Sequence, residues 1–133
     1  MTEPLLTVGD CMKVDLVTLA PDTEIVRAVA ILLDNKVSGA CVLDRAGALV
    51  GVLSKRDCLK AALSAAYYKQ WGSVVADYMS PDPKTLDAGL DLVDAAETMI
   101  GSAFRRFPVL RDGRFVGQIS RTDVLAALSA QWR

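Results

Sequence analysis

The chain has 133 residues, of which 52% are hydrophobic, and its 15 lysines and arginines against 16 aspartates and glutamates leave a net charge of −1. This length is typical of a chain that can bury a core of its own. The near-neutral charge provides no basic field for nucleic acid. No secretory signal pattern begins the sequence, and no apolar run approaches the roughly 20 residues that span a bilayer. We therefore expect a cytoplasmic protein with no membrane or nucleic-acid partner.

The composition disfavours catalysis and metal binding. The sequence has no histidine, and Cys11, Cys41 and Cys58 are an odd number without metal-like spacing. No plausible activated nucleophile lies beside a base. We expect reduced, mostly buried thiols, no metal and no enzyme activity.

The first half predicts a β-α-β-β-α unit. Its elements are a strand at 16–19, a helix with Asp22 or Thr23 as N-cap that runs to about residue 36, two strands at 40–44 and 48–54 joined through Gly47, and a helix that begins at Ser54. The buried helix faces are predicted to carry Ile25, Ala28, Val29, Leu32 and Leu33, and then Cys58, Leu59, Ala62, Leu63 and Ala66.

The second half repeats this plan. A shift of 67 residues superimposes Asp10, Met12, Thr18, Val26, Ala28, Val42 and Leu43 on Asp77, Met79, Thr85, Val93, Ala95, Val109 and Leu110. The predicted elements are a strand at 84–86, a helix at 90–102 with Leu92, Val93, Ala96, Met99 and Ile100 inward, strands within 107–120 and a helix from Arg121. The segment "QWGS" at 70–73 is the predicted joint, which divides the chain into 1–70 and 71–133. Because neither half alone covers both faces of its small sheet, we expect the halves to pack together.

Two matching heptads, "GVLSKRD" at 51–57 and "GQISRTD" at 117–123, end the hairpins of the two halves. Together with "VGDCM", "VADYM", "GACVLD" and "RRFPVL", they resemble the signature of a tandem pair of CBS (cystathionine β-synthase) domains, or Bateman module. The resemblance implies an α/β (α+β) fold of two pseudo-symmetric β-α-β-β-α CBS units packed sheet to sheet. It also implies clefts for AMP, ADP, ATP or S-adenosylmethionine as regulatory ligands, with no catalytic cofactor.

Asp57 and Asp123, the last residues of the heptads, have two interpretations. Each lies three residues after a serine, which is a capping-box pattern at a helix start. An ionised carboxylate also accepts both hydroxyl protons of a ribose diol, and this is the role that the resemblance implies. The two roles are compatible.

The resemblance implies further ligand contacts in each half. The first candidate site comprises Thr18, Ala40, Cys41, Ser54, Lys55, Arg56 and Asp57. The second comprises Thr85, Arg105, Arg106, Phe107, Pro108, Ser120, Arg121 and Asp123. Cys41 replaces the proline that is usual in the family. Three arginines near the second aspartate favour phosphate there, because guanidinium groups match phosphate oxygens.

Two functions of different classes remain open. The first is a stand-alone sensor of adenosine nucleotides that acts in trans on a partner enzyme or transporter, or only on itself. The second is a ligand-free dimeric scaffold for protein interaction. Apolar residues on more than one face of the last helix of each half, including Tyr67, Tyr68 and Trp132, predict a homodimer in either case.

Overall fold

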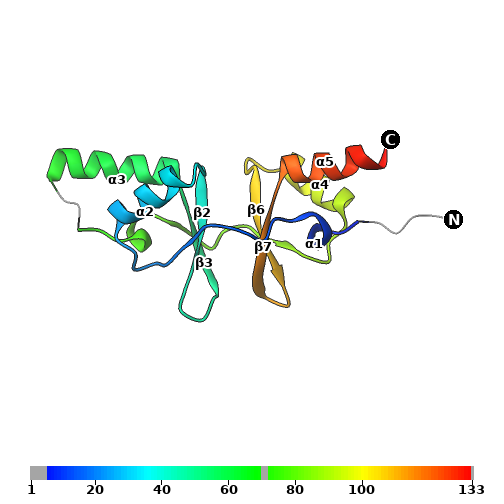
Figure 1. The fold of residues 1–133 in the computed structure, drawn as a ribbon, viewed down its shortest axis with the longest axis horizontal. Helices are drawn as coiled ribbons and strands as arrows, with labels where there is room; N and C mark the ends of the chain where they lie inside the picture. The colour runs from blue at the N-terminus through cyan, green and yellow to red at the C-terminus, as the bar shows by residue number, and fades with distance from the viewer. Residues whose placement is uncertain (1–5, 70–71, 133) are drawn as a thin grey trace. The chain divides into compact units, whose positions relative to one another are not determined.

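The protein is represented by a computed structural model that describes residues 6–69 and 72–132. Two compact units make up the chain (Figure 1). The unit Val17–Pro83 is called the first-repeat unit below. The second-repeat unit combines the residues from Lys84 onward with the segment that ends at Leu16. Gln70 and Trp71 of the predicted joint lie outside the described residues.

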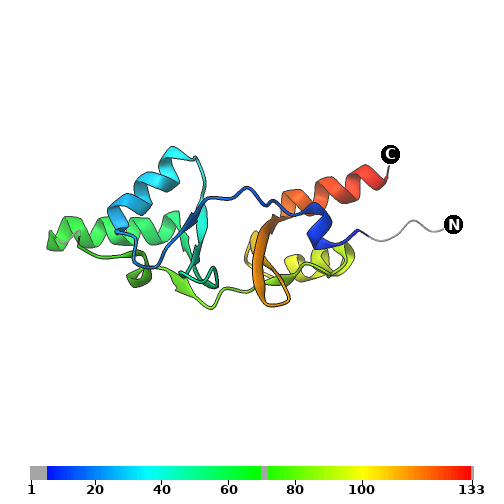
Figure 2. The same cartoon turned by 60° about the horizontal axis from the view of Figure 1, so that its bottom comes forward.

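A mixed sheet with two helices forms the first-repeat unit. Its elements are β1 (Thr18–Leu19), α2 (Ile25–Asp34), β2 (Gly39–Leu43), β3 (Leu49–Ser54), α3 (Lys55–Tyr68), the short 3₁₀ helix η1 (Val75–Asp77) and β4 (Ser80–Pro81). The strand order is β1-β2-β3-β4, with β1 parallel to β2 and the other pairs antiparallel. Helices α2 and α3 cover the sheet (Figure 2), and buried residues of both, such as Ile25 and Ala61, share one core with Leu53.

The second-repeat unit follows the same plan. Its elements are α1 (Val8–Cys11), β5 (Leu86–Asp87), α4 (Leu92–Ile100), β6 (Arg106–Arg111), β7 (Arg114–Ser120) and α5 (Arg121–Gln131). The strand order is β5-β6-β7, with β5 parallel and β7 antiparallel to β6. Phe107, Val109 and Ile119 form the centre of its core.

The segment that precedes each repeat, called its leading segment below, packs on the other copy of the repeat. The described leading segments are residues 6–16 and 72–83. The amides of Val8 and Gly9 donate to the carbonyls of Leu90 and Ala88, each at 2.8 Å, so that α1 lies beside the second repeat (Figure 1). In the first-repeat unit, the Val75 amide donates to the Thr23 carbonyl at 2.9 Å. The predicted division at 1–70 and 71–133 follows the boundary between the repeats. The compact units differ from it, because each contains one repeat and the leading segment of the other.

The buried face of α3 differs from the prediction. Cys58 is buried as expected, but Leu59 and Leu63 are 66% and 57% exposed, and the helix instead buries Ala61 and Ala65. Small side chains let the helix approach the sheet closely, and the larger leucines are left outside the core.

The helices α2 and α4 also expose side chains that were expected inside. Leu33 at the end of α2 is 61% exposed, and Val93 and Ile100 of α4 are 50% and 84% exposed. The N-cap of α2 is Glu24, one to two residues after the predicted N-cap, Asp22 or Thr23. The exposure of Leu33, Val93 and Ile100 has one cause, because apolar spacing marks a helix face but part of that apolar surface remains uncovered.

Candidate ligand-binding site

The ladder of the first-repeat unit gathers the candidate residues at one end of its sheet. Thr18 is the Cα partner of Cys41, and Gly39 is the partner of Ser54. The start of β2 therefore lies between the start of β1 and the end of β3. Asp57 follows in the first turn of α3, directly after this end of the sheet.

The second-repeat unit repeats this arrangement. Arg106 pairs with Ser120, and the Arg121 amide donates to the Arg105 carbonyl at 3.1 Å. Thr85 directly precedes β5, whose Leu86 pairs with Val109. The order of the strands thus brings β5, β6 and the start of α5 together at one edge.

Both heptads form a capping box with the same geometry. The amides of Ser54 and Ser120 each donate to Oδ2 of the following aspartate at 2.9 Å. In return, the amides of Asp57 and Asp123 each donate to the serine Oγ at 3.2 Å. The capping interpretation is confirmed in both units, and it occupies one oxygen of each carboxylate.

The second carboxylate oxygen is left for other partners. Within the described residues, Oδ1 of Asp57 has no hydrogen bond or ion pair, and no side-chain polar atom is both buried and unpaired. This oxygen therefore reaches solvent, although Asp57 as a whole is only 8% exposed. At Asp123, Oδ1 lies 3.8 Å from Nζ of Lys13. An acceptor held at a helix start suits a hydroxyl donor.

The glycines that begin the heptads have a role that the sequence reading missed. A Cβ atom on Gly117 would lie 2.7 Å from the carbonyl oxygen of Lys13 and 2.7 Å from Sδ of Met12. On Gly51 it would lie 2.9 Å from the carbonyl oxygen of Ser80. The glycines therefore admit the exchanged leading segment beside the sheet. The shared "DCM" and "DYM" segments were the available signal.

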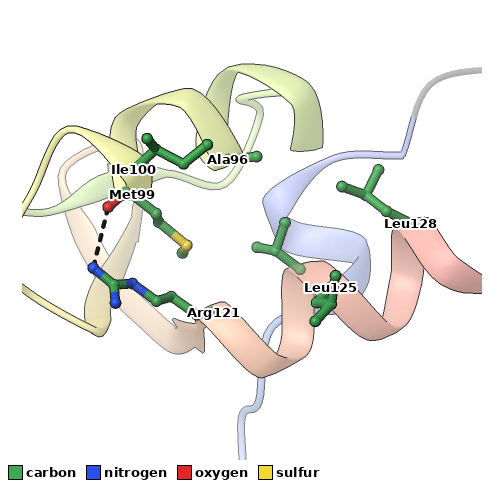
Figure 3. A pocket seen from close by; sticks show the side chains of 7 residues that line it. Ala96, Met99, Ile100, Arg121, Leu125 and Leu128 are labelled. Carbon is green, nitrogen blue, oxygen red and sulfur yellow. Dashed lines mark hydrogen bonds between the residues drawn. The ribbon is translucent and has the colours of Figure 1, made fainter.

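The arginines of the second site do not act as one cluster. Arg121 turns toward α4, where Nη2 donates to the Met99 carbonyl at 3.4 Å (Figure 3). It also donates to the Ser102 carbonyl at 3.0 Å. Both carbonyls lie at or just after the end of α4, where the partial negative charge of the helix terminus favours a cation. Arg105 and Arg106 are exposed at the start of β6. In the first-repeat unit, Lys55 and Arg56 are exposed in the first turn of α3.

Neighbouring residues at the start of β2 and β6 face opposite sides. Ala40 and Phe107 are 2% and 0% exposed, and their side chains belong to the hydrophobic cores. Only their backbone groups are therefore available to a ligand. Cys41 and Pro108 are also buried but belong to neither core cluster, as expected from alternation along a strand.

The cysteines have the raised pKa values of shielded thiols. Burial raises the pKa of Cys41 to about 11. Burial and, secondarily, the Asp57 carboxylate raise the pKa of Cys58. The described residues contain no group of three or more His, Cys, Asp or Glu side chains placed to hold a metal. No helix within the same residues is both long and apolar enough to cross a membrane.

The sequence profile of the CBS domain matches the chain twice, at residues 8–64 and 75–130. The chain belongs to the CBS domain family. Each match includes one heptad and the leading segment that precedes its repeat. The expected family is thereby confirmed.

One solved structure and one curated protein are similar to this chain over nearly its whole length. The crystal structure of CBSX2 in complex with AMP has a TM-score of 0.83 and 35% identity, covering 96% of this chain and 99% of that one. The α/β class is confirmed by this similarity. The uncharacterized protein MJ1225 of Methanocaldococcus jannaschii is 31% identical over 125 residues, which cover 94% of this chain and 44% of that protein.

The curated CBSX2 of Arabidopsis thaliana, described as chloroplastic, is 31% identical over 149 residues. The match covers 91% of this chain and 63% of CBSX2. The chain therefore spans about half to two thirds of these curated relatives.

Proposed function

We propose that this CBS pair is a regulatory module that binds an adenosine nucleotide, AMP, ADP or ATP, at Asp57 and Asp123. The observation that carries the proposal is that the two oxygens of each aspartate have different surroundings. In each unit, Oδ2 caps the helix, and Oδ1 remains available to a ligand. A ribose diol supplies the two hydroxyl donors that such an oxygen accepts. The AMP complex of CBSX2, at 35% identity, supports the same ligand class.

The regulated partner is proposed to be an enzyme or transporter encoded elsewhere. Binding without catalysis fits the side chains at the site, where carboxylates already serve as caps and histidine is absent from the sequence. A cytoplasmic location stays a prediction.

Ligand-dependent stability tests the proposal. A ligand that binds only the folded protein adds about 2.7 kcal/mol to the free energy of unfolding at a concentration 100 times its Kd. AMP should therefore raise the melting temperature by several degrees. GMP and CMP at matched ionic strength control for nonspecific anion binding. Equal shifts with all three would indicate nonspecific anion binding, and no shift with AMP, ADP or ATP would favour the ligand-free scaffold.

We further propose that the module is a homodimer joined through its helices. Leu59, Leu63 and Tyr67 form an exposed stripe on α3. Leu125 of α5 is 62% exposed, and Trp132, which directly follows this helix, is 74% exposed. Both units carry such a surface, which suits self-association about a two-fold axis.

A groove between α4 and α5 continues the exposed surface of the second-repeat unit. It has a volume of about 510 Å³ (Figure 3). Its lining residues are Ala96, Met99, Ile100, Arg121, Val124, Leu125 and Leu128. An apolar groove of this kind accepts a helix of a second copy.

Light scattering at tens of micromolar distinguishes a dimer from a monomer. The wild-type protein and Val14→Glu, which changes a 69% exposed residue outside the helices, should both have the mass of a dimer. Leu59→Glu combined with Leu125→Glu should give a monomer, because charges are costly in an apolar interface. A monomeric wild-type protein would contradict the dimer.

A further inference from the structure

We propose that Lys13 gives the Asp123 site a preference for phosphorylated over unphosphorylated adenosine ligands. This inference rests on the proposed function and adds the residue that selects among such ligands. Lys13 is far from the heptad in sequence, and only the exchanged leading segment brings it to Asp123.

The backbone of Lys13 is fixed beside β7. Its amide donates to the Gln118 carbonyl at 2.8 Å, and the Gln118 amide donates back to the Lys13 carbonyl at 2.9 Å. Gly117 permits this approach, because a Cβ atom there would lie 2.7 Å from the Lys13 carbonyl oxygen. The Lys13 side chain therefore starts at a fixed point beside Gln118, which is two residues before Ser120 in the chain.

The side chain of Lys13 remains available to a ligand. Its ammonium lies 3.8 Å from Oδ1 of Asp123, which is beyond a hydrogen bond, and the side chain is 71% exposed. An exposed pair of this kind contributes little to stability. The flexible stem lets the ammonium move from the carboxylate to a nearby phosphate while keeping its three donors.

Charge explains why phosphate in particular would benefit. Asp123 alone would repel a phosphate group attached to the ribose that it holds. The adjacent ammonium neutralises this repulsion and supplies charge-assisted hydrogen bonds to phosphate oxygens. An unphosphorylated nucleoside gains neither effect, so removal of the charge should weaken only the phosphorylated ligand.

The first-repeat unit contains an uncharged counterpart of Lys13. Ser80 pairs with Val52 on β3, as Lys13 bridges to Gln118 on β7. Serine there places no cation beside Asp57. The two sites have similar capping boxes and therefore differ in charge at this position, which is Lys13 in one unit and Ser80 in the other.

Calorimetry with AMP and adenosine tests the role of Lys13 in the full chain. The Asp57→Asn background is used, because asparagine can keep the cap acceptor while its amide group replaces the free oxygen. In this background, Lys13→Met should weaken AMP binding by about ten-fold, the low end for a charge-assisted bond because Lys13 is 71% exposed. Adenosine affinity should change by less than about two-fold.

Two further variants control for structural effects. Lys13→Arg retains the charge and should retain the AMP preference, whereas Lys60→Met removes an exposed lysine of α3 and should change neither affinity. Equal losses for AMP and adenosine in Lys13→Met, or no loss for either, would overturn the role of Lys13 alone. Failure of the parent protein, with Asp57 intact, to bind AMP, ADP or ATP would instead overturn the proposed function itself.

Discussion

The two units of the chain share the same capping box but differ in the charges around it. Ser54 and Ser120 donate to their aspartates at the same 2.9 Å distance. Within residues 6–69 and 72–132, Asp123 faces a lysine ammonium at 3.8 Å, whereas Asp57 faces none. The repeated helix start therefore does not by itself determine what each site binds.

The differences lie at positions where the fold tolerates change. Arg105 and Arg106 correspond to Ser38 and Gly39 in the repeat, and all except Gly39 are exposed. Buried counterparts remain hydrophobic in both units, as in Val42 with Val109 and Leu53 with Ile119. Because packing constrains the core more than the surface, a duplicated fold can acquire two different binding sites.

The heptad glycines should show the equivalence of the two units most strongly. Gly51→Ala and Gly117→Ala would each place a methyl group within 3.0 Å of the leading segment. Overpacking of this kind costs about 1 to 3 kcal/mol of unfolding free energy. Denaturant unfolding should give similar losses for both variants. Gly72→Ala, where a Cβ atom meets nothing within 4 Å, is the control. Unchanged stability in either heptad variant would mean that the leading segment does not pack there.

Removal of the capping serines should lower stability less than the glycine substitutions, and by different amounts in the two units. Ser54→Ala and Ser120→Ala each remove a cap, which costs about 0.5 to 2 kcal/mol. Ser54 also donates its hydroxyl to Oδ2 of Asp57 at 2.9 Å, so its loss should be the larger. Thermal unfolding of both variants, with the exposed Ser38→Ala as control, measures the difference. A larger loss for Ser120→Ala would contradict the capping comparison.

Transfer of the cation should make the first site resemble the second. Ser80→Lys places an ammonium at the position that Lys13 holds in the other unit. In an Asp123→Asn background, it should strengthen AMP binding relative to adenosine by roughly two- to five-fold, as expected for an exposed charge. Ser80→Gln is the uncharged control. The same gain with glutamine would show that charge is not the cause.

The sequence predicted the repeat, the order of the main elements and the caps because these depend on local patterns. The left-handed turn residues Gly47 and Gly113, with φ of 82° and 79°, illustrate such local control. The exposure of Leu59 and Leu63 on α3 and of Val93 and Ile100 on α4 was not predicted, because periodicity locates an apolar face but not what covers it.

Lys13 and the direction of Arg121 could not be predicted for a different reason. The ion pair with Asp123 depends on which unit the leading segment joins, and sequence distance suggests the other unit. Arg121 is adjacent to the heptad serine, yet it donates to Met99 and Ser102 at the end of α4. Both cases are tertiary contacts that no local spacing encodes.

The most direct test of ligand binding is calorimetric titration of AMP into Asp123→Asn and Asp57→Asn, with denaturant unfolding of the same proteins. Asparagine keeps an oxygen for the cap but replaces the free acceptor with a donor, so stability should change little in either variant. Asp123→Asn should lose about 1.5 to 3 kcal/mol of AMP binding free energy, a roughly ten- to hundred-fold loss of affinity. Asp57→Asn should lose less, because Asp123 pairs with Lys13 and Asp57 has no such partner among the described residues. AMP affinity within about two-fold of wild type in Asp123→Asn would contradict the account and leave the second heptad as a helix start alone.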